Sequence, residues 1–153
     1  MQASLLMTRE LVTCRPDASL AEAAHLMREN HVGFLPVLGR HNKLAGVLTD
    51  RDALMATVSA GKAPAALRVR DAMTQSITCC GPDADLALVE RLLAGARLHR
   101  LPVTDEEGTL LGVISIDDLA RAAARKGDPE FQRSVALTLG EVVKRKSVAD
   151  DED

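Results

Sequence analysis

Two pairs of hydroxyl and carboxylate residues stand at matching places in this chain, 66 residues apart. Thr49 is followed three residues later by Asp52, and Ser115 is followed in the same way by Asp118. Each pair comes directly after an apolar run with a Gly-Val step, where a strand is expected to give way to a helix. Ser/Thr-x-x-Asp at such a place resembles a capping box, which satisfies the first N–H groups of a helix. A single pair would therefore indicate only a helix start.

The doubling of the pair favours a ligand site. A helix N-terminus has free N–H groups and a partial positive charge, which attract an anion such as a phosphate. A carboxylate on the same turn does not suit a phosphate, but it can accept two hydrogen bonds from a vicinal diol. Phosphate beside a diol describes a nucleotide. The two junctions therefore predict nucleotide binding where two like units meet about a two-fold axis.

The junctions belong to an internal repeat. At the 66-residue offset, the first member of each of these pairs returns as the second: Met7-Thr8 and Met73-Thr74, Pro16-Asp17-Ala18 and Pro82-Asp83-Ala84, Leu35-Pro36-Val37 and Leu101-Pro102-Val103, Gly46-Val47 and Gly112-Val113. Each unit alone is too small to bury much apolar surface, so the two are expected to fold as a pair. The repeat therefore predicts two similar units related by a pseudo-two-fold axis.

Each repeat reads strand, helix, strand, strand, helix. In the first repeat we expect a strand at 11–14, a helix capped by Ser19, a hairpin over 34–48 and a helix that ends near Gly61. In the second we expect a strand at 77–80, a helix capped by Asp85, a hairpin over 100–115 and a helix that ends at Gly127.

We therefore predict an α/β (α+β) fold of two β-α-β-β-α repeats. Residues 1–62 form the first repeat, 63–127 the second, 128–146 a C-terminal amphipathic helix and 147–153 an acidic disordered tail. The apolar stripe of the C-terminal helix fits packing on its own domain and packing across a dimer equally well.

The composition limits the class of partner. The chain has 153 residues, of which 46% are hydrophobic and 27% charged, as is typical of a soluble globular protein. Its formal net charge of −3, with two Phe and no Trp or Tyr, disfavours nucleic-acid binding. No apolar run approaches the roughly 18 to 20 residues that cross a bilayer, and the N-terminus lacks the features of a signal peptide. We expect a cytoplasmic protein that binds neither nucleic acid nor membrane.

The cysteines and histidines show no spacing typical of a metal or redox site. The three cysteines form neither a disulfide framework nor a C-x-x-C motif. Cys14 and Cys80 are repeat equivalents in expected strands, where a free cysteine usually serves as a small buried hydrophobe. No catalytic Ser-His-Asp or Cys-His set can be argued from the sequence. We therefore predict no metal, no required cofactor and no enzymatic activity.

Taken together, the doubled motifs resemble a tandem pair of cystathionine-β-synthase (CBS) domains over about residues 5 to 125. The matching features are Met-Thr opening each unit, Pro-Asp-Ala before the first helix, a hydrophobic-Pro-Val middle strand and Gly-Val-hydrophobic-Thr/Ser-x-x-Asp at the end. The resemblance implies two packed repeats with adenine nucleotides or related adenosyl compounds in the clefts between them. It also implies a regulatory role, since no catalytic domain is fused to the pair.

Carried over residue by residue, the resemblance makes Asp52 and Asp118 ribose-binding and Thr49 and Ser115 phosphate-binding. It places the walls of the two base pockets at Val12, Thr13, Leu35, Pro36 and Val37, and at Ile77, Thr78, Leu101, Pro102 and Val103. Apolar strand residues of this kind are equally expected in a core.

The repeats differ where a phosphate would bind. The second has His99 and Arg100 before its middle strand, similar to the phosphate-contacting pair in the γ subunits of energy-responsive kinases, whereas the first has Gly33-Phe34. The first instead carries Arg51, which can make bidentate phosphate contacts, where the second has Ile. The additional carboxylate of Asp117 should weaken phosphate binding in the second repeat. We therefore predict phosphate binding by all three basic residues and two unequal sites.

These observations predict a regulatory module that binds AMP, ADP or ATP and signals to a protein partner. Two alternatives stay open: a structural homodimeric interaction protein with vestigial clefts, and a binder of another adenosyl ligand such as S-adenosylmethionine or NAD. The resemblance also implies a homodimer formed through the helices beside the clefts. Its apolar contact surface would come from Leu54, Met55, Val58, Leu119 and the Ala-rich segment 120–124.

Overall fold

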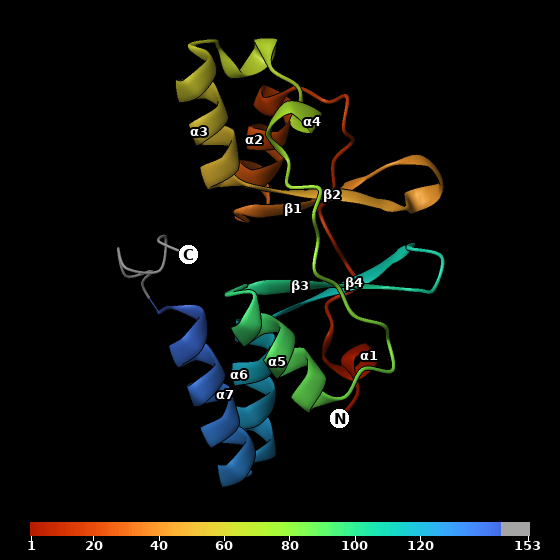
Figure 1. The fold of residues 1–153 in the computed structure, drawn as a ribbon, viewed down its shortest axis with the longest axis vertical. Coiled ribbons are helices and arrows are strands. Elements are labelled where there is room, and N and C mark those ends of the chain that lie inside the picture. Colours follow the sequence, from red (N-terminus) through yellow and green to blue (C-terminus); the bar gives the residue numbers. More distant parts are fainter. Residues whose placement is uncertain (145–153) are drawn as a thin grey trace, which may run out of the picture. The chain divides into compact units, whose positions relative to one another are not determined.

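The computed structural model describes residues 1–144, and its contacts divide the chain into two compact units (Figure 1). Unit 1 comprises residues 1–8, 78–103 and the chain from 113 onward, and unit 2 comprises residues 9–77 and 104–112. Unit 2 thus holds most of the first repeat and unit 1 most of the second. The predicted acidic tail, with the last two residues of the predicted C-terminal helix, lies outside the described residues.

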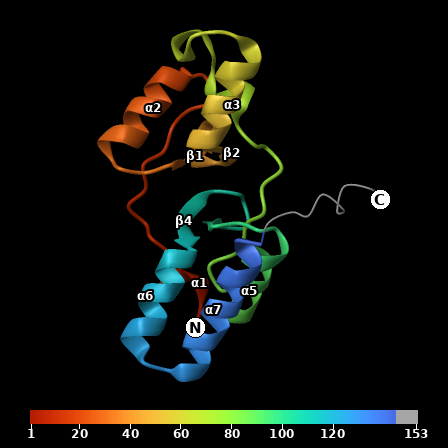
Figure 2. The same cartoon turned by 90° about the vertical axis from the view of Figure 1, so that its left-hand side faces the viewer.

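Unit 2 is a two-stranded antiparallel sheet with two helices packed against it (Figure 2). Its elements are α2 (Leu20–Glu29), β1 (Phe34–Leu38), η1 (Arg40–Asn42), β2 (Leu44–Thr49), α3 (Asp50–Ala60), η2 (Pro64–Ala66) and α4 (Val69–Ala72). Leu35 pairs with Leu48 across the sheet, and both side chains are fully buried in the core beneath α2. The hairpin and both long helices agree with the predicted elements.

Local chemistry fixes the ends of these helices. The Ser19 hydroxyl accepts a hydrogen bond from the Glu22 N–H (3.1 Å), and the Glu22 carboxylate accepts one from the Ser19 N–H (2.7 Å). This capping box starts α2 where the sequence predicts it. α3 ends at Gly61, whose φ of 60° lies in the left-handed region that glycine adopts without a steric penalty.

Unit 1 repeats this arrangement and adds a further helix. Its elements are α1 (Ala3–Leu6), α5 (Leu86–Gly95), β3 (Arg100–Thr104), β4 (Leu110–Ser115), α6 (Ile116–Lys126) and α7 (Pro129–Val142). The tip of the β3–β4 hairpin belongs to unit 2, where the Leu44 N–H donates to the Gly108 carbonyl (2.9 Å) and Lys43 Nζ lies 3.3 Å from Glu107 Oε2. The short helices α1 and α4 were not foreseen from the sequence.

α7 packs on its own unit, alongside α5 and α6 (Figures 1 and 2). Asp128 caps it by accepting a hydrogen bond from the Glu130 N–H (3.0 Å), and Phe131 is buried against the core of unit 1. This placement settles where the C-terminal helix packs. One expected contact residue is wrong: Leu119 is fully buried in the core of unit 1. In the segment 120–124, Ala122 and Ala123 are buried and the other three residues are exposed.

The first strand of each repeat is shorter than predicted. Cys14 and Cys80 form single parallel bridges with Val37 and Val103, and the rest of 11–14 and 77–80 lies outside the sheets. In the first repeat, the proline two residues after the bridge has no N–H to donate, so the ladder cannot continue.

Within residues 1–144, no helix combines the length and the apolar character that a membrane span requires.

Candidate functional site

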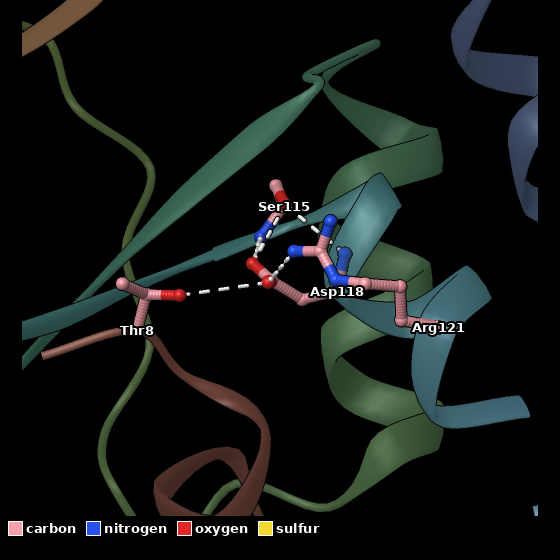
Figure 3. A network of polar contacts seen from close by, with 4 residues as sticks. All are labelled: Thr8, Ser115, Asp118 and Arg121. Carbon is pink, nitrogen blue, oxygen red and sulfur yellow. Dashed lines mark hydrogen bonds and ion pairs between the residues drawn. The ribbon is translucent and has the colours of Figure 1, made fainter. Parts of the chain in front are cut away.

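Asp118, in the first turn of α6, is the centre of a polar network in unit 1 (Figure 3). Its Oδ2 accepts hydrogen bonds from the Ser115 N–H (2.8 Å) and the Ser115 hydroxyl (2.6 Å), while the Asp118 N–H donates to Ser115 Oγ (3.1 Å). Its Oδ1 lies 2.5 Å from a guanidinium nitrogen of Arg121 and 3.5 Å from the hydroxyl of Thr8. The carboxylate therefore receives four hydrogen bonds from within the chain.

Four hydrogen bonds use the whole acceptor capacity of this side chain, since an ionised carboxylate offers about four lone-pair positions. The Asp118 side chain is only 12% exposed, whereas that of Arg121 is 66% exposed. The aspartate is thus held in place by its own helix, and the arginine is the partner that can move away into solvent. A ribose diol could bind Asp118 only after the Arg121 and Thr8 contacts are released.

Asp52 holds the equivalent place on α3 in unit 2, but its surroundings differ. Its Oδ2 accepts a hydrogen bond from the Thr49 N–H (3.0 Å), and its own N–H donates to Thr49 Oγ1 (3.1 Å). No further donor contacts this carboxylate within the described part of the chain. The repeat equivalent of Arg121 is Met55, which carries no charge and is exposed. Asp52 therefore retains acceptor positions for a ligand.

The Gly-Val strand of each repeat pairs with the Met-Thr segment that opens the other repeat. Thr8 and Val113 exchange two main-chain hydrogen bonds (2.9 and 3.0 Å) in unit 1, and Thr74 and Val47 do the same (2.9 and 3.0 Å) in unit 2. The sequence marks these segments as part of the repeat and does not single out either threonine as a site residue. Their return at the same offset, next to the Gly-Val strands, was the signal available in the sequence.

Gly46 explains how closely the second of these segments can approach β2. A Cβ atom at this position would lie 2.8 Å from Met73 Sδ and 3.0 Å from the Thr74 carbonyl oxygen. Any side chain would therefore push the Met73-Thr74 segment away from the strand that leads into Thr49. The glycine of the Gly-Val motif keeps this part of the site together.

The predicted base pockets divide between side chains that are buried and residues that are accessible. In the first repeat, the side chains of Leu35 and Val37 are fully buried in the core of unit 2, and Pro36 is also buried. A ligand could reach the first two only through main-chain atoms. Val12 and Thr13 are half-buried and remain accessible.

The second repeat shows the same division. Leu101, Pro102 and Val103 are buried, whereas Ile77 and Thr78 are half-buried.

The predicted phosphate-binding residues lie near the helix starts, at different levels of exposure. Arg51 is exposed in the first turn of α3. His99 is exposed. Its main-chain carbonyl accepts a hydrogen bond from the Ile116 N–H (3.0 Å), which places it beside the start of α6. Arg100 is half-buried at the start of β3.

A carboxylate overlooked in the sequence changes the charge comparison. Asp50 begins α3, and a Cβ atom on Gly33, the equivalent of His99, would lie 2.8 Å from Asp50 Oδ2. Both helices therefore carry two aspartates in their first turn, Asp50 and Asp52 on α3, Asp117 and Asp118 on α6. α3 carries the basic side chain of Arg51 between its two aspartates, whereas on α6 the guanidinium of Arg121 pairs with Asp118.

Two of the three thiols are structural. Burial raises the pKa of the Cys14 thiol to about 11, and burial, with a smaller contribution from Cys79, raises that of Cys80 to about 11. Cys79 itself is exposed. Within residues 1–144, no group of three or more His, Cys, Asp or Glu side chains is arranged to hold a metal ion.

Comparisons with known proteins identify the repeats. The CBS domain profile matches residues 3–59 and 69–125. The chain is 29% identical over 111 residues to an uncharacterized protein of Methanopyrus kandleri, covering 72% of this chain and 57% of that protein. It is 27% identical over 157 residues to an inosine-5'-monophosphate dehydrogenase of Methanocaldococcus jannaschii, covering 92% of this chain and only 30% of the enzyme. The chain thus spans less than two thirds of these relatives.

A solved structure shows the same fold with a ligand. The crystal structure of CBSX2 in complex with AMP is 29% identical in sequence, with a TM-score of 0.72, and the match covers 83% of this chain and 98% of CBSX2. Both repeats found in the sequence correspond to matches of the CBS profile. The chain therefore belongs to the CBS domain family and carries two CBS domains in tandem.

Proposed function

We propose that this chain is a regulatory module that binds an adenine nucleotide, AMP, ADP or ATP, and signals the bound state to a protein partner. The observation that carries the proposal is the duplicated helix start, with a hydroxyl that caps the helix and an aspartate held on its first turn. The related CBSX2 was solved with AMP, which supports an adenylate as the ligand. No catalytic domain accompanies the repeats in the described residues, which supports regulation rather than catalysis.

In the first repeat, each group of an adenylate has a matching partner. The ribose diol would donate to the acceptor positions left on Asp52. The phosphate would lie near the α3 N-terminus, where the helix dipole and Arg51 favour an anion. The base would contact main-chain atoms of β1 and the half-buried Val12 and Thr13. These assignments, and the equivalent ones in the second repeat, are proposals.

Calorimetry with AMP, ADP and ATP tests the proposal. Asp52→Asn and Asp118→Asn remove the charge while keeping the size of the side chain. Asp71→Asn is the matched control, because Asp71 also caps a helix: its carboxylate accepts a hydrogen bond from the Arg68 N–H (3.1 Å) at the start of α4. Because hydrogen bonds to a charged group contribute about 1.5–3 kcal/mol, each site variant should weaken its own site roughly tenfold or more. Thermal melts would show whether the variants remain folded.

The result that would sink the adenylate proposal is an absence of both heat and thermal shift with all three nucleotides at millimolar concentration. The same titrations with S-adenosylmethionine and NAD then test the alternative ligands. If none binds and both site variants retain partner binding, the chain is a structural protein with vestigial clefts. Since the chain has no Trp or Tyr, strong absorbance at 260 nm in the purified protein would reveal carried nucleotide.

We propose separately that the chain self-associates, with the exposed apolar side chains of α3 as the contact surface. α3 exposes three large apolar side chains, Leu54 (61%), Met55 (51%) and Val58 (68%). The equivalent positions of α6 are also exposed, but they carry two alanines and an arginine: Ala120, Arg121 and Ala124. Light scattering of the wild type and of Val58→Asp would test it: a dimer that the substitution dissociates supports the contact, and a monomeric wild type contradicts it.

A further inference from the structure

Asp117 and Arg121 form a pair of charges on α6 that α3 lacks. At the 66-residue offset, Asp117 stands where the first repeat has Arg51, and Arg121 stands where it has Met55. The two residues are four positions apart, and the carboxylate is the one nearer the N-terminus of the helix. Both members of this pair are therefore particular to the second repeat.

The spacing allows the Arg121 guanidinium to reach either of two carboxylates. Side chains three and four residues apart are neighbours on a helix surface, and at a separation of four the better order has the acidic residue first. In the structure, the guanidinium lies 2.5 Å from Asp118 Oδ1, three residues away (Figure 3). Asp117, four residues away, is exposed, and its carboxylate has no ion-pair partner within residues 1–144. The arginine thus uses one of two partners within its reach.

Of the groups involved, the arginine is the one that can move. Asp118 is held through Oδ2 by the N–H and the hydroxyl of Ser115, and its side chain is only 12% exposed. The Arg121 side chain is 66% exposed. It can therefore turn from one carboxylate to the other by rotation of its own side chain, while α6 and Asp118 keep their places.

We propose that Asp117 is a positioning residue for the second nucleotide site, because it takes over the Arg121 guanidinium when a ribose diol binds Asp118. The inference rests on the proposed function, in which the ribose binds there. The ligand then moves the arginine from one carboxylate to another instead of into solvent, which lowers the free energy needed to open the site. Asp117 thus favours the binding of a nucleoside, although its charge alone disfavours a phosphate.

The expected effect is small and electrostatic. A pair of opposite charges four residues apart on a helix shifts an equilibrium by about 1.4- to 2.3-fold. Asp117→Asn should therefore lower the affinity of the second repeat for adenosine by this factor. Adenosine is neutral, so a carboxylate that acted only by repelling phosphate would leave its binding unchanged. High salt should abolish the difference, because the arginine and Asp117 are both exposed.

Calorimetry with adenosine at low ionic strength measures this effect in an Asp52→Asn background, in which binding to the first repeat is weakened. Asp117→Glu keeps the charge and the spacing, so it should bind as the parent does. Asp117→Asn is also combined with Arg121→Met, where it should have no effect because no arginine remains to be moved. A loss of equal size in that combination would overturn the proposal, and so would unchanged or tighter binding to Asp117→Asn alone.

A measurement without ligand separates this proposal from the proposed function. The NMR signal of the Arg121 Nε–Hε group is assigned by its disappearance in Arg121→Met. In Asp118→Asn the arginine has lost its charged partner and should pair with Asp117, so adding Asp117→Asn should shift the signal again. Asp117→Asn alone should leave the signal almost where the wild type has it.

The two experiments fail in different ways. If adenosine binds to none of the variants, the nucleotide site is wrong, and the NMR spectra alone decide whether Asp117 receives the arginine. If the signal of Arg121 is the same in Asp118→Asn and in the double variant, Asp117 does not receive it and the proposal is overturned, whatever the calorimetry shows.

Discussion

The ion pair between Arg121 and Asp118 makes a quantitative difference between the two repeats testable. Arg121 occupies an oxygen of Asp118 that a ribose diol would need, while the equivalent Met55 leaves Asp52 unobstructed. Arg121→Met should therefore strengthen the binding of adenosine to the second repeat. Conversely, Met55→Arg should weaken the binding of adenosine to the first repeat, because the new arginine can pair with Asp52.

The expected size of the effect follows from the exposure of the pair. The arginine side chain is 66% exposed, so solvent screens the interaction strongly. Exposed ion pairs contribute about 0.2–1 kcal/mol, which corresponds to roughly a 1.4- to 5-fold change in affinity. Adenosine is the appropriate probe because it has no phosphate that could compensate for the arginine by binding it. With AMP, the gain should be smaller, since the freed guanidinium can contact the phosphate in the wild type.

Calorimetry with adenosine should be carried out on Arg121→Met in an Asp52→Asn background, in which binding to the first repeat is weakened and the second repeat dominates the signal. Arg125→Met is the matched control, because it removes an exposed positive charge from the same helix without touching Asp118. The reasoning is refuted if adenosine binds Arg121→Met no more tightly than its parent, or if Arg125→Met gives the same gain.

Three further predictions concern the thiols and the Gly-Val motif. Cys79 should react first with a thiol reagent at neutral pH, with Cys14 and Cys80 reacting only on unfolding, because their raised pKa leaves almost no thiolate. Since these two pKa values are higher in the folded state, their contribution to stability is present below about pH 9 and is lost as the pH rises towards 11, which chemical denaturation at several pH values would measure. Gly46→Ala should destabilise the protein by about 1–3 kcal/mol through its clash with the Met73-Thr74 segment. Gly95→Ala, which meets nothing within 4 Å, should leave the melting temperature unchanged or raised.

Much of the fold could be predicted because the ends of several helices are set by residues that are neighbours in the sequence. Ser19 with Glu22 and Asp128 before Pro129 mark helix starts that depend only on neighbouring residues, and both helices begin there. Gly61 likewise ends α3. The predicted strand at 11–14 is reduced to a single bridge at Cys14, because a β-rich composition does not show how soon a proline interrupts the hydrogen bonds between strands.

The candidate site was only partly predictable for a similar reason. The capping geometry of Asp52 and Asp118 is local, so the sequence pattern was sufficient to predict that each is held by its hydroxyl partner. The contact of Thr8 with Asp118 joins positions 110 residues apart, and no spacing rule connects them. Whether the apolar side chain of Leu35 faces a ligand or the core depends on which face of the strand is covered, which the alternation of residues alone did not decide.

The crossed attachment of the Met-Thr segments has a consequence for how the chain can be divided. Thr8 opens the first repeat but pairs with the last strand of the second, and Thr74 opens the second but pairs with the last strand of the first. A fragment with only one repeat would therefore keep its Met-Thr segment but lose the strand with which that segment pairs. Its own Gly-Val strand would likewise lose the Met-Thr segment of the other repeat. Two copies of one such fragment could restore both by exchanging these segments. The tandem chain is, in this sense, the covalently linked form of a segment-swapped dimer.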